Sequence, residues 1–336
     1  MPLPLIPVVL GGAALLSAAF GVKKGVDAKS DFDSADRWNR KAQDVYDEAN
    51  KKLKSAHKKA QKSMNLLGES KFTIYQNSII PFVDYFSRIK NIKFDDSRLI
   101  DAGNLPQVTT TELNQLKETA LEMKEIVGGG IAALGSGGLA GLAAYGSVGL
   151  LGTASTGTAI GSLGGVAATN ATLAWLGGGS LAAGGLGMAG GTVVLGGLVA
   201  GPVLAVGGMM LASKAEAAKY DAYANYDNAK LAAEQMESAK VATKGIERRF
   251  NEINSVLNAL NDKFLPLLSS LEDLVLANDN YSTYSEIDKK GVFMAASIAK
   301  TIKSIMETPL IDNMGVLTPD STKAVALAEQ SLAFIE

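Results

Sequence analysis

The sequence predicts an all-α protein in which a helical cytoplasmic bundle with long antiparallel helices adjoins a glycine-rich helical transmembrane domain. Two long stretches carry apolar residues at helical spacing, no stretch of useful length alternates like a strand, and one long block carries no charge. A length of 336 residues also favours two structural regions over one core. The predicted regions are an N-terminal apolar segment (1–22), a helical cytoplasmic region (23–125), a glycine-rich transmembrane region (126–213) and a second helical cytoplasmic region (214–336) that packs on 23–125.

The N-terminal segment, residues 2–22, is apolar and ends at Lys23 and Lys24. No basic residue precedes it, so it does not resemble a cleaved secretory signal. After Pro7 it offers about 16 helical residues, roughly 24 Å, which is short for a bilayer crossing. Whether it crosses, lies at the interface or packs at an oligomer axis stays open. Lys23, Lys24 and Lys214 flank apolar ends, and the positive-inside tendency then places both charged flanks in the cytoplasm.

The first charged flank begins with a long amphipathic helix. Ser30, with Asp33 three residues later, resembles a capping box at its start. At 100° per residue its apolar side chains share one stripe over roughly eight turns. The stripe consists of Trp38, Ala42, Val45, Ala49, Leu53, Ala56, Ala60, Met64 and Leu67. Its small alanines suit a closely packed antiparallel partner.

The second charged flank supplies this partner, with Pro266 as an expected kink or break. Its expected stripe consists of Tyr220, Ala224, Leu231, Ala239, Ala242, Ile246, Ile253, Leu257, Leu260, Phe264, Leu267 and Leu271. Shorter helices are expected over 71–93, 109–126 (with Thr109 and Glu112 as a capping box), 285–307 and 319–335.

The uncharged block, residues 126–213, separates the flanks. It is 88 residues long and holds 27 of the 36 glycines, whereas 23–125 has 19 basic and 16 acidic residues and 214–336 has 13 and 18. Residues 126–152 and 192–213 are each long enough to span a bilayer. Residues 153–191 are interrupted by polar and glycine-rich stretches and read as short or re-entrant helices. With both flanks on one side, the number of crossings is even.

Glycine spacing within this block predicts close helix packing. Gly157, Gly161 and Gly165 fall on one helix face, and Gly137/Gly141 and Gly197/Gly201 repeat the four-residue spacing. In so glycine-rich a run, chance accounts equally well for any single pair. The polar side chains expected to line a water-filled path are Thr156, Thr158, Ser162, Thr169, Asn170 and Thr172. Helix-to-helix hydrogen bonding is the alternative for each of them.

A lysine-rich face on the first long helix is the main candidate ligand site. Lys51, Lys54, Lys58 and Lys62 fall within about 80° of one another, opposite the apolar stripe. Such a face suits the phosphates of an oligonucleotide or anionic lipid head groups. The alternative is a solvated surface, partly balanced by Asp47–Lys51 and Glu48–Lys52 pairs. Arg248 and Arg249 are weaker candidates for the same role.

The composition argues against most enzyme chemistry. The chain has no cysteine and only one histidine, His57, so thiolate sites and multi-histidine metal sites are excluded. The glycine-rich block contains no lysine and therefore no phosphate-binding P-loop. We expect a non-enzyme with no catalytic residue, no metal site and no cofactor, and we regard His57 as incidental.

Two strings carry a resemblance. MPLPLIP with GVKKGVDAKS at the N-terminus, and ATLAWLGGGSLAAGG over 171–185, resemble a family of glycine-rich bacterial membrane proteins, and the chain is similar to the membrane-channel effector of the Hailong anti-phage system. The resemblance implies an oligomeric inner-membrane ion channel in antiviral defence. Its gating ligand would be a short single-stranded oligonucleotide made by a partner nucleotidyltransferase.

From the residues themselves, the first hypothesis is a self-associating membrane channel or pore effector that is gated by a phosphate-rich ligand. The alternatives are a pore-forming toxin with an insertable hydrophobic hairpin and a membrane-anchored helical scaffold.

Overall fold

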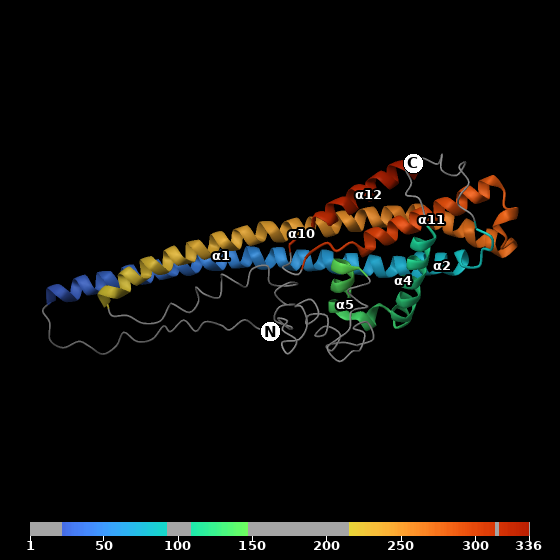
Figure 1. Cartoon of the computed structure of the whole chain (residues 1–336). Coiled ribbons are helices and arrows are strands. Elements are labelled where there is room, and N and C mark those ends of the chain that lie inside the picture. The colour runs from blue at the N-terminus through green and yellow to red at the C-terminus, as the bar shows by residue number, and fades with distance from the viewer. Residues whose placement is uncertain (1–21, 93–108, 147–214, 313–315, 336) are drawn as a thin grey trace.

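A computed structural model describes residues 22–92, 109–146, 215–312 and 316–335, and the regular structure within these ranges is all helical (Figure 1). The all-α prediction is therefore confirmed. The elements are α1 (Val22–Ile74), the π-helix η1 (Tyr75–Ile79), α2 (Ile80–Phe86), α4 (Thr110–Gly128), α5 (Ile131–Tyr145), α10 (Ala215–Ala277), the short 3-10 helix η4 (Tyr281–Thr283), α11 (Glu286–Glu307) and α12 (Pro319–Ile335).

The two longest helices, α1 and α10, lie side by side along the length of the molecule and run in the same direction (Figure 1). Contacts between them advance together along both helices. They pair Trp38 with Tyr223, Leu53 with Met236, Ser70 with Asn258, and Phe82 beyond α1 with Phe264. The predicted antiparallel pairing is wrong. An apolar stripe does not determine whether its partner helix is parallel or antiparallel. The chain between α1 and α10 is long enough to return to the level where α1 begins, so that α10 can run parallel to it. We call this pair of helices the rod.

A seven-residue repeat places α10 against its partner. The fully or nearly fully buried positions of the repeat are Ala222, Ala229, Met236, Thr243, Phe250, Leu257, Phe264 and Leu271. A repeat of seven gives 3.5 residues per turn, which keeps one seam in contact along a left-handed coiled coil. The stripe projected at 3.6 residues per turn drifts by about 20° per repeat from this seam. It therefore matches the seam near Phe264 and is wrong near the start of α10, where Ala224, Leu231 and Ala242 are exposed.

Side-chain size along the seam increases from one end of the rod to the other. Ala222 and Ala229 lie in its first part, and Phe250 and Phe264 in its second. The first part is a slender two-helix coil, whereas α2, α4, α5, α11 and α12 gather around the second part (Figure 1). The principal core lies within that gathered end.

Helix α1 is longer than expected and passes into a π-helix. It begins at Val22 rather than Ser30, and it continues through Lys71 to Ile74, so the expected separate helix over 71–93 does not exist in that form. Pro81 follows the π-helix. Proline has no N–H and its ring crowds the carbonyl four residues earlier. In the π-helix just before Pro81, the amide of Ile80 donates to the carbonyl of Tyr75, which lies five residues earlier rather than the usual four.

Three of the shorter helices are confirmed. At α4, the amide of Thr109 donates to Glu112 at 2.9 Å and the amide of Glu112 donates to Thr109 Oγ1 at 3.3 Å, which is the predicted capping box. Helices α11 and α12 occupy the expected residues, and Ser285 caps α11. The prediction of a break at Pro266 is wrong, because α10 continues through it to Ala277.

The uncharged block is described as far as Gly146. Its first expected span, 126–152, does not form one helix there: α4 ends at Gly128, Gly130 has a φ of 74°, and α5 follows. The positive φ favours glycine at that turn. Among the described residues, no helix combines the length and apolar character needed to cross a bilayer. The second expected span, 192–213, lies outside the described residues.

Candidate functional site

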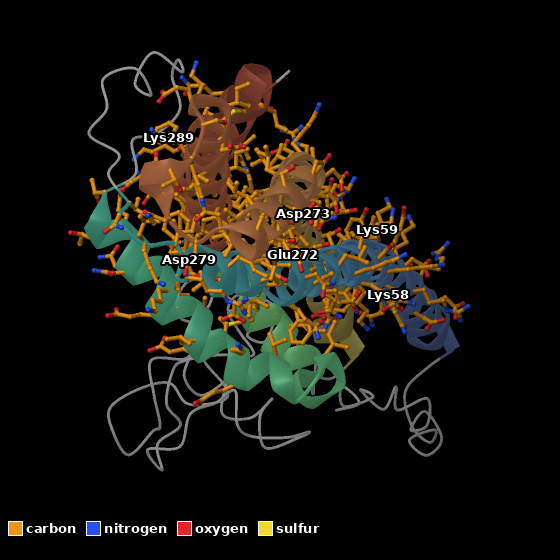
Figure 2. The ribbon with its side chains drawn as sticks, turned by 90° about the vertical axis from the view of Figure 1, so that its right-hand side faces the viewer. Lys58, Lys59, Glu272, Asp273, Asp279 and Lys289 are labelled. Atoms are coloured by element: carbon orange, nitrogen blue, oxygen red, sulfur yellow. The ribbon has the colours of Figure 1, made fainter. Side chains whose placement is uncertain are left out.

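The four predicted ligand-binding lysines, Lys51, Lys54, Lys58 and Lys62, all have exposed side chains on α1. Neighbouring Lys59 is exposed as well, and Figure 2 shows Lys58 and Lys59 at the outer edge of the molecule. Lys52 forms the expected pair with Glu48, at 2.7 Å. The face is thus a solvent-facing basic strip on a continuous helix.

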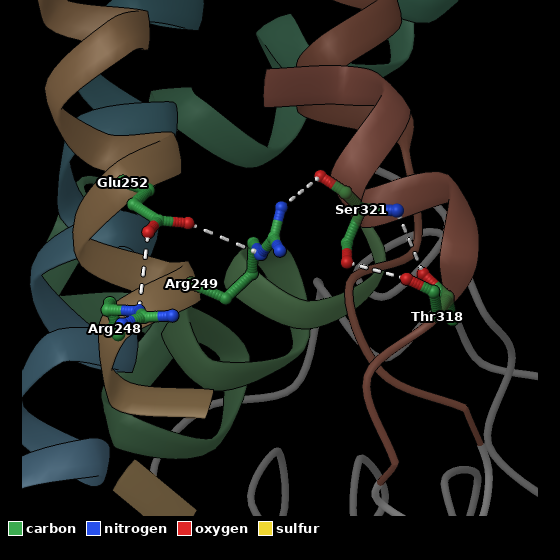
Figure 3. Close-up of polar contacts among 5 residues, drawn as sticks. All are labelled: Arg248, Arg249, Glu252, Thr318 and Ser321. Carbon is green, nitrogen blue, oxygen red and sulfur yellow. Dashed lines mark hydrogen bonds and ion pairs between the residues drawn. The ribbon is translucent and has the colours of Figure 1, made fainter. Parts of the chain in front are cut away.

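Arg248 and Arg249 do not share one environment. Arg248 is exposed and lies 3.5 Å from Glu252. The guanidinium of Arg249 is mostly covered: it donates to the carbonyl of Ser321 in α12 at 3.1 Å and lies 3.4 Å from Glu252 (Figure 3). Arg249 therefore joins α10 to α12, and its donors are directed at the protein.

Most of the predicted glycine and pore positions belong to the part of the uncharged block after Gly146. Gly157, Gly161, Gly165, Gly197 and Gly201 lie outside the described residues, as do Thr156, Thr158, Ser162, Thr169, Asn170 and Thr172. Gly137 and Gly141 belong to α5, and Gly141 is buried.

The most unusual polar group of the described chain is Lys71, whose side chain is completely buried. Its ammonium donates to the carbonyls of Leu142 at 3.1 Å, Ala143 at 2.9 Å and Met306 at 2.8 Å. The first two carbonyls belong to the last turn of α5 and the third to the last turn of α11. Carbonyls at a helix end have no intrahelical donor and carry the negative end of the helix dipole. Lys71 thus caps two helices at once.

Tyr75 and Glu307 complete this arrangement, which we call the Lys71 clamp: Lys71, Tyr75, Glu307 and the three carbonyls that Lys71 contacts. Tyr75 is fully buried one turn after Lys71, and its hydroxyl donates to the Glu307 carboxylate. Burial lowers the pKa of Lys71 from 10.5 to about 7, and the nearby Glu307 carboxylate opposes this decrease. The clamp thus places an ionisable lysine among the buried apolar side chains of the principal core.

Two glycines bring the backbones close enough for the clamp to form. A Cβ atom on Gly68 of α1 would lie 2.2 Å from the carbonyl oxygen of Leu139 in α5. Gly146 ends α5 with a φ of 66°, and a Cβ there would lie 2.6 Å from the carbonyl oxygen of Met306. The amide of Leu310 also donates to the carbonyl of Ala144 at 2.8 Å. Helix α5, which belongs to the first part of the uncharged block, is therefore seated directly on the backbone of α1.

The sequence reading missed this site. Lys71 stands nine residues after Lys62 and was not distinguished from the surface lysines before it. A signal exists, because Met64, Gly68, Lys71 and Tyr75 follow the spacing of one helix face, and a lysine and a glycine among larger apolar side chains on one face are unusual. What that face contacts could not be predicted.

Comparison of the chain with protein-family models, with curated proteins and with solved structures finds no match.

The lowered pKa of Lys71 predicts a pH-dependent stability. Between about pH 7 and pH 10.5 the unfolded chain holds a proton on Lys71 that the folded chain has released, so the free energy of unfolding rises with pH in this window. Relative to Lys71→Met, the wild-type value should rise by up to about 1.4 kcal/mol per pH unit and stay level below about pH 6. Urea denaturation followed by circular dichroism measures it. A difference that is constant from pH 6 to pH 10 would contradict the assignment, and Lys62→Met serves as the exposed control.

Proposed function

We propose that the protein is an oligomeric channel or pore effector of the bacterial inner membrane, in which the uncharged block enters the bilayer and the coiled-coil rod controls it. The observation that carries this proposal is where the rod meets that block. The 88-residue uncharged block begins within α4, continues in α5 held against α1 by the Lys71 clamp, and ends just before α10. A segment of this length without any charge suits hydrocarbon better than water.

The two junctions lie at different heights along the rod. Gly146 follows α5 beside Lys71, whereas Ala215 begins α10 eight residues before Tyr223, which packs on Trp38. From residue 38 to residue 71, a helix extends about 50 Å. A change in the coil would therefore reach the chain after α5 and the chain before α10, which lie at different points along the coil.

The lysine face of Lys51, Lys54, Lys58 and Lys62 is the proposed receptor for the control signal. It lies on α1 between these two heights and faces solvent. A short oligonucleotide from a partner nucleotidyltransferase, as the resemblance implies, would supply the phosphates. The ligand can shift the channel between closed and open states only if it binds them with different affinity.

Oligonucleotide binding tests the lysine face. Replacing Lys51, Lys54, Lys58 and Lys62 with glutamine should weaken the binding of a labelled tetra-adenylate. The slope of log K against log salt should shrink by up to about 2.8, because each lost contact with a single strand removes about 0.7. The matched control replaces Lys117, Lys244, Lys263 and Lys290, four other exposed lysines, and changes the net charge equally. Equal affinity and salt slope in the two variants would remove the face as the receptor.

The channel itself is tested by ionic conductance in vesicles of phosphatidylethanolamine and phosphatidylglycerol that contain the full chain. We expect conductance that depends on the tetra-adenylate. A protein that stays in the membrane pellet after carbonate washing but never conducts would be a membrane-anchored scaffold instead.

One observation favours a second candidate, a pore-forming toxin with an insertable hairpin. The apolar α5 packs its Leu139, Leu142, Ala143 and Ala144 into the core instead of standing free. This is how a protein stores an apolar segment in water. A chain that is fully soluble after carbonate treatment and that permeabilises vesicles when added from outside would favour the toxin.

A further inference from the structure

Helix α5 packs mainly on one other helix and is bounded by glycines at both ends. Its contacts are mainly with α1, and a second contact is made with the segment that follows α11. Gly130 before it and Gly146 after it both have positive φ, and only Gly129 and Gly130 separate it from α4. Glycines at both ends let the flanking chain change direction without steric cost. Glycine turns thus bound α5 on both sides.

Beyond its apolar packing, α5 is held on α1 by specific backbone and polar contacts. Gly68 admits the backbone at Leu139, and Lys71 receives the carbonyls of Leu142 and Ala143. The same lysine bonds Met306, so α5 and α11 are attached to α1 through one side chain. Loss of this one donor would remove a bond from both helix ends together.

We propose that α5 is a releasable latch: it is docked on α1 at Gly68 and the Lys71 clamp in water, and it leaves α1 when the protein engages a bilayer. This inference rests on the proposed membrane function. Undocking would expose the apolar face formed by Leu139, Leu142 and Ala143, which is buried while α5 is seated. That exposure is unfavourable in water and favourable in lipid, so a bilayer shifts the equilibrium.

Cysteine labelling in the full chain tests the latch, because the chain has no cysteine of its own. Ala140→Cys and Leu139→Cys place the thiol on the buried face of α5, where the native side chains are 6% and 8% exposed. Ile131→Cys, at a residue 39% exposed, reports full labelling. In water we expect maleimide to react at Ile131→Cys and to spare the two buried positions. Vesicles of phosphatidylethanolamine and phosphatidylglycerol should raise labelling at the buried positions about tenfold or more, since the rate follows the open population.

Gly68→Ala should release α5 without any membrane. The added methyl group would meet backbone atoms of Leu139 that cannot rotate away, so labelling of Ala140→Cys in water should rise about tenfold or more. Gly245→Ala in α10 is the matched control, because the new methyl group there would meet only the side chain of Leu317, at 3.9 Å. Circular dichroism checks that both variants keep their helices.

The results with vesicles distinguish the latch proposal from the channel proposal. Buried positions that stay unreactive while the same vesicles conduct would overturn the latch and leave the channel standing. Labelling that rises with vesicles in a chain that never conducts would support the latch and contradict the channel. Equal labelling of Ala140→Cys in the Gly68→Ala and Gly245→Ala backgrounds would overturn the docking contact.

Discussion

Replacing Lys71 with alanine is expected to lower the free energy of unfolding by about 3–5 kcal/mol, the range for removing a buried polar group together with its packing. The substitution removes the donor for Leu142, Ala143 and Met306 and leaves space beside Tyr75. A buried carbonyl at a helix end that loses its donor lowers the free energy of unfolding by about 1–3 kcal/mol. Some of that cost is recovered, because Leu142 also receives the amide of Gly146 at 3.0 Å.

Lys71→Met separates the two contributions to this loss. Methionine keeps the length of the side chain and removes only the donor, so it should lose less than alanine does. Lys62→Ala, on the exposed face of the same helix, should change stability by no more than about 0.5 kcal/mol. Urea denaturation of the purified full chain measures all three. A Lys71→Ala chain as stable as Lys62→Ala would mean that the clamp does not hold the helices together.

Local sequence signals predicted the ends of several helices. Thr109 with Glu112 and Ser285 before α11 are caps whose partners lie three residues away, so their geometry depends on neighbouring residues alone. Ser30 and Asp33 have the same spacing, yet α1 passes through them. A capping box stabilises a helix that begins at that residue, but it does not prevent the helix from beginning earlier. The break expected at Pro266 is likewise absent, since α10 continues through that position.

The direction of the coiled coil was not available from local signals. Trp38 was expected to pack against other residues, and it does, 4.7 Å from the ring of Tyr223 and 5.0 Å from that of Tyr226. Neither an apolar stripe nor a heptad repeat distinguishes a parallel from an antiparallel partner when the connection is long. The clamp shows the same limit, because the three carbonyls that Lys71 contacts are 71, 72 and 235 residues away.

Replacing Phe264 with alanine is the second substitution expected to lower the free energy of unfolding strongly. It tests the part of the contact between α1 and α10 where the buried side chains are large. Phe264 is fully buried at one of the seven-residue positions of α10, and its ring meets that of Phe82 edge to face at 5.7 Å. Loss of a buried phenylalanine typically costs about 3–5 kcal/mol. Leu265→Ala, at the adjacent residue that is 41% exposed, should cost much less. Similar losses at both positions would contradict the placement of Phe264 at the buried contact between the helices.

The pair with Phe82 makes the same experiment a test of chain direction. Phe82 lies beyond the end of α1, so it meets Phe264, far along α10, only if the two helices run the same way. A double-mutant cycle of Phe82→Ala and Phe264→Ala should give a coupling of about 0.5–1.5 kcal/mol, as measured for aromatic pairs in contact. Helices that ran in opposite directions would separate these rings by most of the rod, and their losses would then be additive. Additive losses would therefore contradict the parallel coil on which the placement of both junctions of the uncharged block depends.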